Sequence, residues 1–128
     1  IEETRHVCTA PLTPLSFIDR NADVFRDNKM AIVYGDRRYS YREFGERVNR
    51  LASALRNAGL RKGDRVAFLC PNIPPMLEAH FAVPLAGGVL VAINTRLSSE
   101  EIAYILDHSG SSFLFVDTEL AGLVAPVR

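Results

Sequence analysis

The sequence lacks the features that mark metal-binding, nucleic-acid-binding and membrane-spanning proteins. Its two cysteines, Cys8 and Cys70, form no C-x-x-C motif and no metal-ligand spacing. Lys plus Arg and Asp plus Glu both number 15, so no excess charge favours nucleic acid or an anionic membrane. The longest apolar run, 82–93, is too short to span a bilayer and is broken by proline and glycine. We therefore expect no metal site, no nucleic-acid partner and no transmembrane segment, and a reduced, cytoplasmic compartment explains the cysteines most simply.

Phosphate-binding loops and catalytic triads are also missing. Neither G-x-G-x-x-G nor G-x-x-x-x-G-K-S/T occurs in the 128 residues. The sequence places no serine, cysteine or carboxylate convincingly beside any histidine, so we predict no catalytic residue in this chain. The chain begins at Ile1, and its last helical run is unfinished at Arg128. We take these ends as an expectation that the chain is part of a longer protein.

Three apolar runs alternate with helical patterns in the second half of the chain. The runs Val66–Leu69, Val89–Ile93 and Ser112–Val116 are continuously apolar or nearly so, as is typical of parallel strands buried on both faces. A helical run starting at Pro74-Pro75 joins the first two, and a second helix starting at Ser98 or Ser99 precedes the third. This alternation predicts an α/β fold with a mainly parallel β-sheet flanked by helices.

The first half of the chain predicts a different arrangement. Residues 1–12 show no strong period and are interpreted as an extended arm. After a short helix that begins at Thr13-Pro14, two β runs flank Gly35-Asp36 and predict a β-hairpin. A long amphipathic helix follows, and Gly59 ends it. Its apolar stripe is spaced at i, i+4, i+7, i+8 and i+11 and consists of Phe44, Val48, Leu51, Ala52 and Leu55.

Local signals predict how the helices begin. Ser40 with Glu43, and Ser98 with Glu101, have the spacing of capping boxes. Asn72 follows a predicted strand and is expected to cap the next helix through its side chain. The other asparagine after a strand, Asn94, is expected to close a turn by local hydrogen bonds. His80 on the helix between the first two strands is interpreted as a packed or partly exposed side chain.

Six short segments are informative through their order along the chain. They are Pro14-Leu15-Ser16-Phe17-Ile18, Tyr34-Gly35-Asp36-Arg37-Arg38-Tyr39-Ser40-Tyr41, Val48-Asn49-Arg50-Leu51-Ala52, Lys62-Gly63-Asp64-Arg65-Val66, Pro71-Asn72 and Asn94-Thr95-Arg96-Leu97. In this order they resemble the start of an AMP-forming acyl-CoA synthetase of the adenylate-forming superfamily, and they cover most of the chain. The resemblance is to the short- and medium-chain, fatty-acid branch, in which Thr-Arg-Leu follows an asparagine at the end of a strand.

The resemblance implies an activity for a longer parent protein. Such ligases use ATP, Mg²⁺ and coenzyme A to convert a carboxylic (fatty) acid, through an acyl-adenylate, into an acyl-CoA. The family's phosphate loop, ribose-binding carboxylate and catalytic lysine all lie beyond the region that this chain covers. The resemblance therefore implies that residues 1–128 are the N-terminal portion of the large AMP-binding domain. We expect this portion to be incompetent in catalysis alone and to bind none of the cofactors tightly.

One residue of this chain is expected to touch a cofactor. In related coenzyme A ligases the arginine of the Asn-x-Arg-Leu motif contacts the phosphate end of coenzyme A, which here implies Arg96. Arg96 lies just past the carboxyl end of a predicted strand, where open α/β sheets bind ligands. A guanidinium group suits a phosphate. The alternative is a surface arginine with no ligand.

Two other functions remain open at this point. The parent could be another adenylate-forming enzyme, either a peptide-synthetase adenylation domain or a luciferase-like oxidase, because these share the same N-terminal organisation. The chain could also be a truncated, non-catalytic α/β interaction module. In the whole ligase another sheet is expected to pack on this part of the fold, so residues 1–128 alone are expected to expose apolar surface and to self-associate through it.

Overall fold

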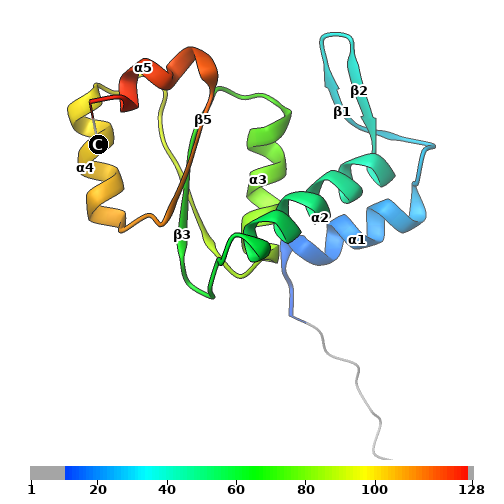
Figure 1. Cartoon of the computed structure of the whole chain (residues 1–128). Helices are drawn as coiled ribbons and strands as arrows, with labels where there is room; N and C mark the ends of the chain where they lie inside the picture. The colour runs from blue at the N-terminus through cyan, green and yellow to red at the C-terminus, as the bar shows by residue number, and fades with distance from the viewer. Residues whose placement is uncertain (1–10, 127–128) are drawn as a thin grey trace, which may run out of the picture.

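The computed structural model describes residues 11–126 and confirms the α/β fold, with a parallel sheet and a separate antiparallel hairpin (Figure 1). The strands are β1 (Met30–Tyr34), β2 (Arg37–Ser40), β3 (Arg65–Leu69), β4 (Val89–Ala92) and β5 (Phe113–Val116). The helices are α1 (Pro14–Val24), α2 (Tyr41–Asn57), α3 (Pro74–Leu85), α4 (Ser99–Ser109), a 3-10 turn η1 (Thr118–Leu120) and α5 (Ala121–Val124). Most of the predicted arm, residues 1–12, lies outside the described residues, and the arm stays a prediction.

The parallel sheet has the order β4-β3-β5, so β3 is central and is joined to a strand on each side. Side chains alternate along β3. Val66 and Phe68 pack with α2 and α3, whereas Ala67 and Leu69 pack with α4 and α5 on the opposite face. Helices therefore cover both faces, as predicted, and the continuous apolar run of β3 is explained by burial on both sides.

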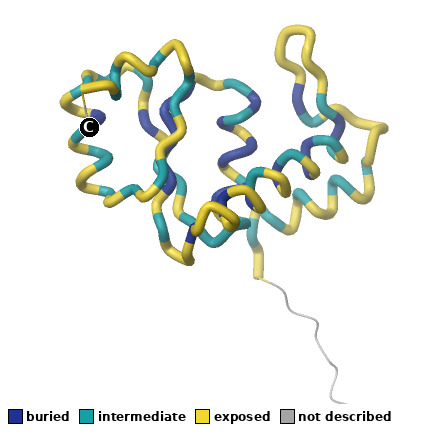
Figure 2. Tube along the Cα trace, viewed as in Figure 1, coloured by how far each residue is buried: buried dark blue, intermediate teal, exposed yellow. Residues whose placement is uncertain are grey.

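The outer strands are less buried than their apolar runs predicted. All residues of β4 and β5 are partly or fully exposed, and Leu114 and Phe115 on β5 are 39% and 37% exposed. Each of these strands has only one neighbour in the described sheet, so its outer side is uncovered. Buried residues concentrate along β3, α2 and α3 (Figure 2).

A second core lies between α1, α2, α3 and the hairpin. The predicted stripe of α2 faces it and the sheet, and four of its five members are buried. Gly45 lets α1 and α2 approach closely, because a Cβ there would lie 3.1 Å from the Cβ of Ala22. α3 ends at Leu85, one residue after Pro84, which removes a helical hydrogen bond.

Two of the three predicted caps need correction. Ser98 and Glu101 form the complete capping box of α4. At α2 only half of the predicted box forms: Ser40 Oγ accepts from the Glu43 backbone N–H, but the Glu43 carboxylate makes no return bond. Ser40 is also the last residue of β2, and its hydroxyl donates to Asp27.

The third predicted cap, Asn72 on α3, is wrong. Ile73 occupies the N-cap position, and no side chain caps this helix. The reason is that α3 begins with Pro74 and Pro75, which have no N–H to be capped. The next N–H, on Met76, donates to the Ile73 carbonyl at 3.0 Å instead.

Two sets of polar contacts, which we call polar ties, hold together the helical part of the fold, which consists of α1, α2, α3 and the hairpin. In the first, the Arg47 guanidinium of α2 pairs with the Glu78 carboxylate of α3 and stacks 4.4 Å from the Tyr39 ring centroid. Glu78 is buried, and the pairing raises the pKa of Arg47. In the second, Asp27 accepts from Ser40 Oγ at 2.8 Å and from Arg42, which lowers the Asp27 pKa. The first tie connects α2 to α3 and, through Tyr39, to β2, whereas the second connects the segment before β1 to the end of β2 and the start of α2.

Within residues 11–126, no helix combines the length and apolarity needed to cross a membrane.

Candidate functional site

The connections that follow β3 and β4 leave the sheet toward opposite faces. The loop after β3 leads to α3, which packs on the face formed by Val66 and Phe68. The loop after β4 leads to α4, which packs on the face formed by Ala67 and Leu69. Adjacent parallel strands whose connections diverge in this way leave a crevice at their carboxyl ends, and open α/β sheets bind ligands there.

A groove of about 530 Å³ occupies this crevice. We call it the polar groove. It is formed by the segment after β3, one side of α3, and the end of β4 with its following loop. Its lining residues are Cys70, Pro71, Asn72, Met76, His80, Ala92, Ile93, Asn94, Thr95 and Arg96. The structure therefore brings together Asn72, Asn94 and Arg96, which the sequence had singled out separately.

Arg96 lies in this groove with its backbone held and its side chain free. The Arg96 N–H donates to Asn94 Oδ1 at 2.9 Å, which confirms the predicted local turn. The guanidinium group is exposed and forms no ion pair or hydrogen bond with any residue from 11 to 126. The donors of the exposed guanidinium are therefore available to an anion.

The groove lining carries no acidic side chain. Arg96 and His80 are its basic residues, and asparagine amides, a threonine hydroxyl and apolar atoms make up much of the rest. A guanidinium group in a lining without a carboxylate favours an anionic ligand such as a phosphate ester.

Cys70, at the bottom of the groove, is packed rather than reactive. Its side chain is a free thiol that is buried next to Phe68 and Met76. Burial, together with the negative charge of Asp117, raises the pKa of Cys70 above its ordinary value. Since the thiolate is the nucleophilic form, the geometry gives Cys70 no catalytic role.

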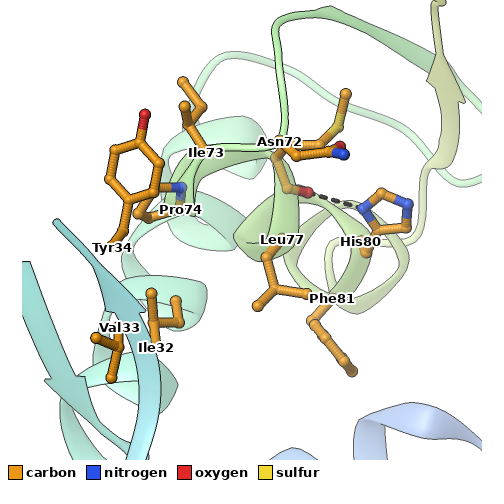
Figure 3. Close-up of a pocket in the computed structure, with 10 residues that line it drawn as sticks. Ile32, Val33, Tyr34, Asn72, Ile73, Pro74, Leu77, His80 and Phe81 are labelled. Atoms are coloured by element: carbon orange, nitrogen blue, oxygen red, sulfur yellow. Dashed lines mark hydrogen bonds between the residues drawn. The ribbon is translucent and has the colours of Figure 1, made fainter.

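A second cavity of about 480 Å³ lies between the hairpin and α3 (Figure 3). We call it the apolar pocket. Ile32, Val33 and Tyr34 of β1 form one wall, and the start of α3 forms the other. It shares Asn72, Met76 and His80 with the polar groove. Sequence reasoning missed this pocket, because nothing in the sequence shows that the hairpin lies against α3.

Comparison with known proteins identifies the class. The family model described as "AMP-binding enzyme" matches residues 18–127, so the chain belongs to the AMP-binding enzyme family. Among curated proteins, the chain is similar to 4-hydroxybutyrate–CoA ligase 2 of Metallosphaera sedula, with 50% identity over 106 residues. It is also similar to the peroxisomal acetate/butyrate–CoA ligase AAE7 of Arabidopsis thaliana, with 45% identity over 108 residues. These matches cover 83% and 84% of the chain but 19% of each relative, so the chain spans about a fifth of their length.

Solved structures give the same assignment. A putative long-chain-fatty-acid CoA ligase from Rhodopseudomonas palustris superposes with a TM-score of 0.85 at 36% identity, covering 91% of this chain and 29% of that one. The N-terminal subdomain of Klebsiella oxytoca NpsA, in complex with anthranilyl-AMSN, gives a TM-score of 0.74 at 29% identity and covers 81% and 27%. The resemblance to acyl-CoA synthetases is therefore confirmed, and an adenylation enzyme of another kind shares the fold at a lower score.

Proposed function

We propose that the chain is the N-terminal part of an AMP-forming acid–CoA ligase and supplies a coenzyme A contact rather than catalytic groups. The whole enzyme would use ATP and Mg²⁺ to form an acyl-adenylate and would then transfer the acyl group to coenzyme A. The family match and the CoA-ligase relatives support this reading. The chain alone would bind these cofactors weakly, because it supplies only one wall of the site.

The single observation that carries the proposal is the free Arg96 guanidinium in a groove without carboxylates. Arg96 would donate hydrogen bonds to the phosphate end of coenzyme A. A hydrogen bond to a charged group contributes about 1.5–3 kcal/mol, which corresponds to a roughly 10- to 100-fold change in affinity.

The test is Arg96→Ala in the full-length ligase. We expect the KM for coenzyme A to rise by about tenfold or more. ATP–pyrophosphate exchange, which reports the adenylation step before coenzyme A binds, should remain unchanged. Arg37→Ala, at the start of β2 in the hairpin, is the matched control. An unchanged KM for coenzyme A in Arg96→Ala would refute this role.

The acid substrate is proposed to be a small aliphatic carboxylic acid. Support comes from the relatives, whose names specify 4-hydroxybutyrate, acetate and butyrate. The NpsA complex with an anthranilyl compound favours aryl acids as the second candidate. Pyrophosphate exchange with butyrate, anthranilate and a panel of amino acids separates these possibilities, since only the true substrate class supports exchange.

Self-association of residues 1–128 is also proposed, through exposed apolar side chains such as Phe17, Leu77 and Phe115. Light scattering should give a mass above that of the monomer, and the mass should rise with protein concentration. A constant monomer mass at high concentration would contradict the proposal.

We further propose a reducing, cytoplasmic compartment for the whole protein. The free thiol of Cys70 supports a reducing compartment. The alternative location is the peroxisome, because some relatives are named as peroxisomal. Microscopy of a fluorescent fusion of the whole protein distinguishes the two locations.

A further inference from the structure

His80 lies where the two cavities meet. It is exposed on α3, and it lines both the polar groove and the apolar pocket. In Figure 3 its ring and the side chain of Asn72 lie on the side of α3 away from β1. A ligand that extends from the Arg96 end of the groove toward the pocket therefore passes His80.

One ring nitrogen of His80 is already occupied. Nδ1 lies 2.7 Å from the Met76 carbonyl oxygen, which can only accept a hydrogen bond (Figure 3). Nδ1 therefore carries the hydrogen, and the ring is held in one orientation. Nε2 forms no hydrogen bond with the part of the chain that the structure describes. In the neutral ring Nε2 is then a free acceptor at the junction of the groove and the pocket.

The two cavities differ in what they can bind. The polar groove offers the Arg96 guanidinium to an anion, and the apolar pocket offers mainly hydrocarbon from Ile32, Leu77 and Phe81. His80 Nε2, which lies between the two cavities, can accept a hydrogen bond from a donor on the ligand. The ligand that fits has a phosphate at one end and then an arm that carries N–H or O–H groups.

We propose that His80 Nε2 accepts a hydrogen bond from an amide N–H or hydroxyl of the pantetheine arm of coenzyme A, while Arg96 holds the phosphate end. This inference rests on the proposed function, because it takes coenzyme A as the ligand of the polar groove. His80 is then a binding residue that recognises the arm. It takes no part in adenylation, which precedes coenzyme A binding.

The experiment measures two ligands on the full-length ligase. Coenzyme A contains both the phosphates and the arm, whereas adenosine 3′,5′-bisphosphate contains phosphates without the arm. The variant His80→Phe keeps a ring of similar size but removes the acceptor, and His80→Gln restores an acceptor. The control is His108→Phe, because His108 stacks on Tyr104 of α4, outside the lining of the groove.

His80→Phe should weaken the binding of coenzyme A by roughly three- to tenfold, which is the effect of losing one neutral hydrogen bond. It should leave the bisphosphate unchanged, and His80→Gln should recover most of the loss. Equal weakening of both ligands, or no weakening of coenzyme A, would overturn the inference. Arg96→Ala should weaken both ligands. If it weakens neither while His80→Phe still weakens coenzyme A, the role of Arg96 fails and that of His80 stands.

A second measurement uses no substitution, so it tests the inference even if a His80 variant fails to fold. In the unsubstituted protein, the ¹⁵N resonance of His80 Nε2 should shift when coenzyme A is added and should not shift with the bisphosphate. If the Nε2 resonance does not shift at saturating coenzyme A, the inference is overturned without any substitution.

Discussion

The two parts of this small fold differ in the polar contacts that supplement their apolar cores. Around the sheet, Ala67 and Leu69 of β3 and Ile102 of α4 are completely buried in an apolar core. The Arg65 side chain of β3 adds an exposed hydrogen bond to the Ser109 carbonyl at the end of α4. In the helical part, a buried carboxylate, Glu78, is paired with an arginine from another helix. Both parts have apolar cores, but only the helical part contains a buried ion pair, whose carboxylate depends on its partner.

The largest effect is expected in the sheet. Leu69→Ala should lower the free energy of unfolding of residues 1–128 by about 3 kcal/mol, because it removes a fully buried side chain and leaves a cavity. Leu114→Ala on the edge strand β5 makes the same chemical change at a position that is 39% exposed, and it should cost roughly a third as much. Urea unfolding measures both. Equal losses of unfolding free energy in the two variants would show that burial at the central strand β3 is not what makes its side chains more stabilising than those of the edge strand β5.

The helical part should instead respond to a charge. Arg47→Met leaves the Glu78 carboxylate buried without its cation, and removal of one partner from a buried pair typically costs about 3–5 kcal/mol. Because the Arg47 side chain is 34% exposed, we expect a smaller loss, about 2 kcal/mol.

Glu78→Gln is the matched change on the other side of this pair. It keeps a hydrogen-bond acceptor and leaves only a partly exposed arginine unpaired, so it should cost about 1 kcal/mol. Urea unfolding of the two variants tests the order. A larger loss for Glu78→Gln than for Arg47→Met would show that burial of Glu78 is not the source of the asymmetry.

The same contrast explains what could be predicted from the sequence. β3 was predicted correctly because an unbroken apolar run carries its own signal for burial on two faces. The capping box of Ser98 and Glu101 was predicted because both partners lie within one helical turn. These signals depend only on neighbouring residues.

Contacts between distant segments were not predictable. Arg47 lies outside the predicted apolar stripe of α2, and its partner on α3 lies 31 residues away. The helical period shows which side of α2 is polar, but it does not show which helix packs beside it. The polar groove was anticipated only at Arg96, through resemblance, whereas its junction with the apolar pocket at His80 depends on how the hairpin lies against α3.

The smallest effect is expected at the exposed tie between Asp27, Arg42 and Ser40, whose contribution to stability depends on pH. Hydrogen bonds from Arg42 and Ser40 lower the pKa of Asp27 in the folded state below its unfolded value. The stabilisation is therefore present above the ordinary carboxyl pKa of about 4 and is lost as pH falls through the lower, folded pKa. Salt should weaken it, because both side chains of the ion pair are about half exposed.

Asp27→Asn should consequently lower the urea midpoint at pH 7, and this difference should shrink as the pH falls through the lowered, folded pKa of Asp27. The control is Asp36→Asn in the hairpin turn between β1 and β2. A difference between Asp27→Asn and the unsubstituted chain that stays constant from pH 7 to pH 2 would mean that Asp27 acts through its shape and not its charge. The helical part would then be fixed by one charged tie, Arg47 with Glu78, and not by two.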